Sequence, residues 1–148
     1  MAKHQSVAHM FRNRVAATPD LEAYSWREGD AWKSFTWAQP AGVVNELAAG
    51  LRALGLQDED RVGILSGTRV EWLFADLSVM VAGGATTTIY PSTPADESEY
   101  IINNSGSVLI FVENDKQVAK LLTQRAKLTN VRNLIVIDGT DGAHDGWV

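Results

Sequence analysis

The sequence predicts an α/β protein in which a β-hairpin precedes a β-α-β-α-β-α-β unit with a parallel sheet. Short apolar segments alternate with segments of helical periodicity, and the junctions carry capping residues, glycine or proline. The apolar segments show no polar alternation, which is typical of parallel strands covered by helices on both faces. Right-handed crossovers are expected between them. The four strands are predicted at 61–65, 85–90, 107–112 and 133–138.

A helix and the hairpin come first. Ser6 can cap a helix that Pro19 ends, because the residue before a proline is pushed out of the α conformation. The segments 22–26 and 31–37 flank a polar turn that contains a glycine, so they are predicted to pair as a hairpin. The apolar face of the helix would consist of Val7, Met10, Phe11 and Val15.

A second helix is predicted from a capping box at Thr36-Trp37-Ala38-Gln39. Pro40 lies in the first turn, where a missing amide donor costs least, and Gly55 is a natural left-handed residue after the helix. The apolar positions of this helix would be Val43, Val44, Leu47, Leu51 and Leu54.

Three more helices are predicted between the strands. One spans about 70–81 and is apolar on most of its circumference; another spans about 95–104 and begins with acidic residues that suit a helix N-terminus. The last would carry Val118, Leu121, Leu122 and Ala126.

Composition excludes several classes of protein. The 148 residues suit one globular domain, with 45% hydrophobic and 21% charged residues. A net charge of −5 argues against a nucleic-acid partner. The absence of cysteine excludes disulfides and thiolate metal sites. No secretory h-region and no membrane-spanning run is visible, so a cytoplasmic location is expected. The polar, glycine-rich tail suggests a chain cut within a loop.

Two polar features lie among the apolar elements. Ser66-Gly67-Thr68 joins a strand to a helix, a geometry that can offer amides to an anion. No lysine follows as in a Walker A loop, so a plain turn is favoured. Asp76 is expected at the wet edge of its helix, which it shares with Glu71.

The histidines and tryptophans receive structural interpretations. His4, His9 and His144 have no second ligand at metal spacing, so no metal site is expected. Basic residues of the first helix could touch an anionic membrane, but docking of that helix on its own domain is favoured. These basic residues are Lys3, Arg12 and Arg14. Burial is favoured for tryptophans in patterned elements. The five tryptophans are Trp26, Trp32, Trp37, Trp72 and Trp147.

A family resemblance rests on the order and spacing of short motifs. These motifs are Leu54-Gly55, Asp60-Arg61-Val62, Trp72, Gly84-Ala85 and Tyr90-Pro91. Together they resemble the start of the AMP-forming adenylating enzymes, and the match runs from Ser6 to Asp138. The segment 100–114, which reads YIINNSGSVLIFVEN, is most similar to the bacterial long-chain fatty-acid branch.

The resemblance implies a two-step reaction for a full-length ligase. A long-chain fatty acid would react with ATP, with Mg²⁺ bridging phosphates, and CoA would then displace AMP from the acyl-adenylate. The family's phosphate loop ending in Pro-Lys-Gly, its later adenylate motifs and its C-terminal lysine do not occur in this chain. Residues 1–148 are therefore expected to be the N-terminal portion of the adenylation domain, without catalytic residues or bound cofactors and inactive alone.

The loop after the second parallel strand is the one weak cofactor candidate. In the family this loop lies near the route by which CoA approaches, which makes Tyr90, Ser92 and Thr93 candidates for contact. Some relatives carry an arginine where this chain has Ser92. Pro91 and Pro94 fix the loop, so a structural role is favoured over cofactor contact.

Several alternatives stay open. The chain could be a stand-alone interaction or regulatory module of the same ancestry, or part of a luciferase-like or peptide-synthetase enzyme. Peripheral contact with the inner membrane surface is a further alternative. The helix at 70–81 is apolar on most of its circumference, and in the relatives later parts of the domain would cover it. In this chain its surface around Trp72, Leu73 and Val79 is therefore expected to face water, and the chain is expected to self-associate or to be less stable than the intact enzyme.

Overall fold

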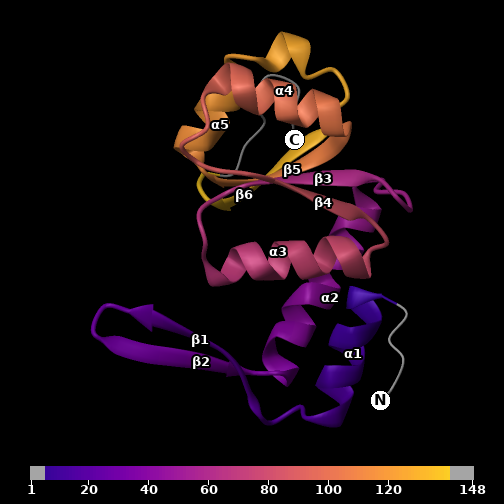
Figure 1. Cartoon of the computed structure of the whole chain (residues 1–148), viewed down its shortest axis with the longest axis vertical. Helices are drawn as coiled ribbons and strands as arrows, with labels where there is room; N and C mark the ends of the chain where they lie inside the picture. The colour runs from indigo at the N-terminus through magenta and orange to yellow at the C-terminus, as the bar shows by residue number, and fades with distance from the viewer. Residues whose placement is uncertain (1–5, 141–148) are drawn as a thin grey trace.

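The computed structural model describes residues 6–140, which form an α/β body with a hairpin beside it (Figure 1). In chain order the elements are α1 (Val7–Ala17), β1 (Glu22–Glu28), β2 (Ala31–Thr36), α2 (Ala38–Ala53), β3 (Arg61–Leu65), α3 (Val70–Val81), β4 (Ala85–Ile89), α4 (Ala95–Ser105), β5 (Ser107–Asn114), α5 (Asp115–Leu122), the 3-10 helix η1 (Arg125–Lys127) and β6 (Asn133–Asp138).

The sheet has the strand order β4-β3-β5-β6, and every neighbouring pair is parallel. In the centre, Ile64 of β3 pairs with Thr88 of β4 and with Phe111 of β5. β1 and β2 pair separately as an antiparallel hairpin. The predicted fold class, a hairpin followed by alternating parallel strands and helices, is confirmed.

Helices cover both faces of the sheet, which explains why its central strands are continuously apolar. Val62 and Ile64 of β3 point toward α2 and α3, where they pack with Leu51 and Val79. Leu65 belongs to the opposite core, under α4 and α5. Figure 1 shows α3 on one side of the sheet and α4 and α5 on the other. Successive residues of the central strands therefore reach different cores, and both faces of these strands are largely apolar.

A third apolar cluster joins α1, α2, α3 and the base of the hairpin. Phe11, Val44 and Phe74 are buried in it. Aromatic rings bind the hairpin to this cluster: Phe35 lies 5.7 Å from Phe74, and Trp37 lies 6.3 Å from Phe11 between ring centroids. Because Phe11 anchors α1 on its own domain, the structure supports the favoured interpretation of that helix.

Long-range contacts at the amino edge of the sheet explain the Asp60-Arg61 motif in structural terms. Asp60 Oδ2 accepts hydrogen bonds from the Gln57 amide at 2.9 Å and from Arg132 Nη2 at 3.1 Å. Arg61 Nε donates to the Ser105 carbonyl at 2.7 Å, so a cation lies at the C-terminus of α4. Gly106 follows with a φ of 67°, and a Cβ there would lie 2.6 Å from Arg61 Nη2.

Several details of the predicted helices are wrong. Ala126 lies in η1, because α5 ends at Leu122. Only half of the predicted capping box forms: Gln39 Oε1 accepts from the Thr36 amide at 2.9 Å, while α2 has no side-chain cap at its first residue. Trp37 already has α-helical backbone angles, which moves the Thr36 hydroxyl away from the amides it was expected to cap.

Several burial predictions are also wrong. Trp32 is 73% exposed, because it faces outward on the hairpin. Val79 is fully buried under the sheet rather than facing water, while Trp72 and Leu73 are half-buried. Several apolar residues of the first two helices are exposed instead. They are Val7 and Met10 of α1, Val43 of α2, and Leu54 directly after α2.

The two-sided core makes a stability prediction. Leu109 of β5 is 0% exposed, so Leu109→Ala should leave a cavity and lower the free energy of unfolding by about 2–5 kcal/mol. Leu21→Ala removes the same atoms at a 61% exposed site and should change it by less than about 1 kcal/mol. Urea denaturation of both variants measures the difference. Equal losses would show that Leu109 does not lie in a packed core.

Candidate functional site

The carboxyl edge of the sheet gathers the chain's candidate binding residues. In open α/β sheets, ligands bind outside the carboxyl ends of the strands. Here the turn after β3 and the loop after β4 enclose a hollow of about 270 Å³. Its lining residues are Ser66, Thr68, Trp72, Thr88, Ile89 and Tyr90. The fold thus brings the Ser66-Gly67-Thr68 turn beside Tyr90, with hydroxyls and two aromatic rings around one space.

The turn itself is poorly suited to an anion. The Gly67 amide donates to Glu113 Oε2 at 3.4 Å, and the Ser66 hydroxyl donates to the Gly67 carbonyl at 3.1 Å. An anion at this amide would therefore meet a carboxylate. The geometry supports the interpretation of 66–68 as a plain strand-to-helix turn.

The loop at 90–94 presents its candidate residues differently. Tyr90 is 80% exposed, Ser92 is exposed and Thr93 is half-buried. The Thr93 amide donates to the Tyr90 carbonyl at 3.0 Å, which closes a tight turn. An exposed ring and nearby hydroxyls can contact a ligand that passes over this edge.

Lys120 of α5 lies behind this loop. Its Nζ donates to the Pro91 carbonyl at 2.7 Å and to the Thr93 carbonyl at 2.8 Å. Burial, together with the nearby charge of Lys116, lowers the pKa of Lys120 below its usual value. No pattern in the sequence points to this residue, because its partners lie 29 and 27 positions away along the chain.

Arg69 is a second residue at this edge that sequence reasoning missed. Its Nε donates to Glu71 Oε2 at 2.6 Å, and its Nη1 donates to Asp138 Oδ2 at 2.5 Å. Arg69 thereby joins the start of α3 to the end of β6. The hydrogen bond from Arg69 holds the pKa of Glu71 below its usual value of 4.5.

The remaining candidates do not converge. Asp76 is partly exposed on α3, as expected. Among residues 6–140, no group of three or more histidine, aspartate or glutamate side chains could hold a metal ion. His4, His144, Lys3 and Trp147 lie outside the described residues. No helix in that described range is long and apolar enough to cross a bilayer.

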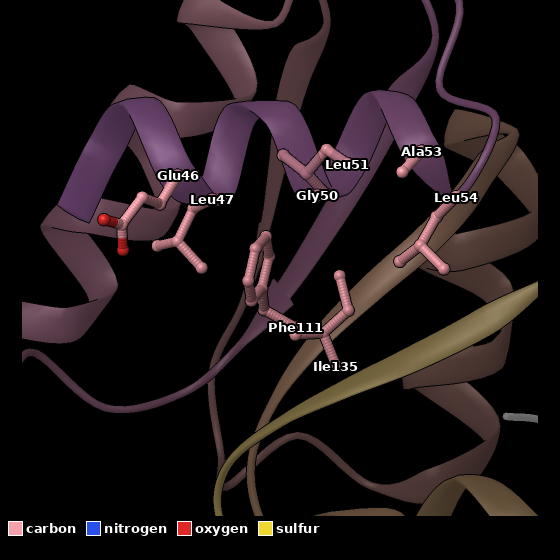
Figure 2. Close-up of a pocket in the computed structure, with 8 residues that line it drawn as sticks. All are labelled: Glu46, Leu47, Gly50, Leu51, Ala53, Leu54, Phe111 and Ile135. Carbon is pink, nitrogen blue, oxygen red and sulfur yellow. The ribbon is translucent and has the colours of Figure 1, made fainter. Parts of the chain in front are cut away.

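A second hollow, the α2 groove, lies between α2 and the sheet and holds about 350 Å³ (Figure 2). Leu47 of α2 and Leu54, which directly follows α2, face Phe111 and Ile135 across it. Gly50 contributes no side chain, which leaves the space open. The groove is lined by Glu46, Leu47, Gly50, Leu51, Ala53, Leu54, Phe111 and Ile135. Apart from Glu46, its walls are apolar and suit packing against another apolar surface.

One protein-family model matches nearly the whole chain. The model of the AMP-binding enzyme family matches residues 11–147. The chain is 29% identical over 140 residues to the long-chain-fatty-acid–CoA ligase FadD15 of Mycobacterium bovis, which covers 95% of this chain and 23% of that protein. It is 30% identical over 130 residues to the long-chain-fatty-acid–CoA ligase ACSBG2 of Xenopus laevis, covering 88% of this chain and 18% of that one. The chain thus spans about a quarter or less of these relatives.

Solved structures give the same fold. Acetoacetyl-CoA synthetase from Streptomyces lividans superposes with a TM-score of 0.84 at 26% identity, over 97% of this chain and 24% of that one. A fatty acyl CoA synthetase of Mycobacterium tuberculosis superposes with a TM-score of 0.79 at 26% identity, over 89% of this chain and 26% of that one.

The ion pairs of Arg69 make a pH-dependent prediction. A lowered pKa means that Glu71 adds stability above pH 4.5 and loses this contribution as the pH falls through its folded-state pKa. Arg69→Met should therefore lower the free energy of unfolding by about 1 kcal/mol at pH 7, and the deficit should narrow at pH 3.

Urea denaturation at both pH values measures this deficit. Arg27→Met is the control, because Arg27 pairs with the fully exposed Asp30 and should change little at either pH. A deficit of Arg69→Met that is the same at pH 3 and pH 7 would contradict the assignment.

Proposed function

Because the chain belongs to the AMP-binding enzyme family, we propose that residues 1–148 are the N-terminal portion of the adenylation domain of an AMP-forming long-chain fatty-acid–CoA ligase. One observation carries the proposal: the likeness to long-chain ligases extends over 95% of this chain but only 23% of the relative. A segment with this coverage supplies part of a domain, and the other parts of the ligase would supply the chemistry.

The proposed reaction has two steps. The fatty-acid carboxylate attacks the α-phosphorus of ATP, which forms acyl-AMP and releases pyrophosphate. The CoA thiol then attacks the acyl carbon, which releases AMP and leaves the acyl-CoA thioester. Residues 6–140 contain no carboxylate cluster for Mg²⁺, and the chain contains no phosphate loop ending in Pro-Lys-Gly. No step of adenylation is therefore assigned to the residues of this segment.

CoA is the ligand that this segment would approach. The exposed ring of Tyr90 and the hydroxyls of Ser92 and Thr93 lie at the carboxyl edge of the sheet. Lys120, the cation behind the loop, already donates to two backbone carbonyls. Contact through the ring and hydroxyls suits an uncharged part of CoA better than its phosphates. Any contact with an anionic membrane surface would fall to the exposed Arg12 and Arg14 of α1.

A segment exchange tests the proposal. A chimera that carries residues of this chain in place of the matching segment of FadD15 should form acyl-CoA from a long-chain fatty acid, ATP and CoA. The 148-residue chain alone should show only background exchange of pyrophosphate into ATP, because it lacks the phosphate loop.

A second chimera with the same boundaries carries Leu109→Ala, which should weaken folding. Comparison of folding and acyl-CoA formation in the two chimeras shows whether low activity comes from poor folding. A well-folded first chimera without acyl-CoA formation would overturn the proposal and would favour a stand-alone interaction module. Fatty-acid-dependent pyrophosphate exchange by the chain alone would overturn the assignment of its missing motifs.

Because the α2 groove is open and mostly apolar, we expect the isolated chain to self-associate. We propose that other parts of the ligase cover this groove and that a second copy takes their place when the chain is alone. Leu54 is 39% exposed at its rim, so Leu54→Glu should weaken association without unfolding the chain. Light scattering over a dilution series measures the effect.

Leu21→Glu places the same charge at an exposed site away from the groove and should leave association unchanged. A wild-type chain that stays monomeric at high concentration and binds no apolar dye would show that the groove needs no partner.

A further inference from the structure

We propose that Lys120 is a positioning residue that holds the loop 90–94 in place by clamping the two carbonyls on either side of Ser92. The inference rests on the proposed function in one respect: that function makes this loop the approach surface for CoA. The clamp itself is a property of the described residues and involves no ligand.

The need for an outside donor follows from the composition of the loop. Pro91 and Pro94 have no amide hydrogen, so the loop has few donors with which to satisfy its own carbonyls. Its internal backbone hydrogen bond runs from the Thr93 amide to the Tyr90 carbonyl. The Ser98 hydroxyl reaches the Thr93 carbonyl only at 3.4 Å, so the Pro91 and Thr93 carbonyls need a closer donor from another element.

Lys120 meets this need with one group. Its Nζ lies 2.7 Å from the Pro91 oxygen and 2.8 Å from the Thr93 oxygen, so one ammonium bridges the loop. Hydrogen bonds from a charged donor are stronger than neutral ones, and partial burial protects them from water. Gln117 Nε2 also points at the Pro91 oxygen, but at 3.4 Å its hydrogen bond is longer and weaker.

The clamp has a consequence for the hollow at the carboxyl edge. Tyr90 directly precedes Pro91 and lines that hollow together with Trp72. Ser92 is the residue between the two clamped carbonyls. Releasing the carbonyls would free the backbone that sets both side chains, so the clamp defines the surface that a ligand meets.

Three variants of the 148-residue chain test the clamp by hydrogen exchange. Lys120→Met keeps most of the side-chain length but removes every donor, and it should speed exchange of the Thr93 amide, which donates to the Tyr90 carbonyl, about tenfold or more. Lys120→Arg keeps a charged donor and should restore most of the protection. Lys116→Met is the matched control: Lys116 is exposed on the same helix and should leave the loop unchanged.

Each outcome decides the proposal. Faster exchange confined to the loop, with β3 and β5 still protected, supports it. Unchanged loop exchange in Lys120→Met, equal acceleration throughout the sheet, or failure of Lys120→Arg to restore protection would each overturn it. If Lys120→Met does not fold, the wild-type chain still gives an answer: an ammonium resonance of Lys120 that exchanges as fast as that of Lys116 would overturn the clamp.

The chimera separates this proposal from the proposed function. There Lys120→Met should raise the KM for CoA several-fold and leave fatty-acid-dependent pyrophosphate exchange unchanged, because adenylation does not use CoA. An inactive chimera would count against the proposed function alone, since the hydrogen-exchange result needs no activity. Altered exchange of pyrophosphate with an unchanged KM for CoA would overturn the link between the clamp and CoA.

Discussion

Burial of the parallel sheet on both faces is the constraint on which the rest of the structure depends. Val62 and Ile64 of β3 and Leu109 and Ile110 of β5 are all 0% exposed. Side chains that carry polar chemistry cannot occupy such positions without a large desolvation cost. The strand ends are therefore where this fold can present polar groups, and its two edges use them differently.

The amino edge is closed by long-range contacts, whereas the carboxyl edge keeps a hollow. Arg61 caps α4, and Arg132 hydrogen-bonds to Asp60 and to the Gly55 carbonyl. These contacts hold segments far apart in sequence together at the amino edge of the sheet. At the other edge, Arg69 and Lys120 fasten the surroundings of the hollow but leave Tyr90 exposed. This asymmetry fits a segment whose structural motif lies at one edge and whose ligand surface lies at the other.

Sequence reasoning recovered the elements and missed the contacts between them, for a physical reason. Strand and helix positions follow from local periodicity and capping, so 70–81 was predicted with the bounds of α3. The exposure of Leu54 and the burial of Val79 depend on which neighbour covers each residue, and local periodicity does not contain that information. Lys120 could not be found for the same reason, because its two acceptors come from another strand-to-helix loop.

The way the cations are used bears on what this segment adds to a ligase. Arg61 and Lys120 donate to backbone carbonyls, and Arg69 and Arg132 pair with carboxylates. Each of these charges therefore fixes a loop or the end of an element. A cation already held in this way is a poor partner for a diffusing phosphate, because the new contact would compete with the acceptors that the cation already has. Under the proposed function, the segment would contribute shape and loop placement to the site, and charge for the phosphates would come from elsewhere in the enzyme.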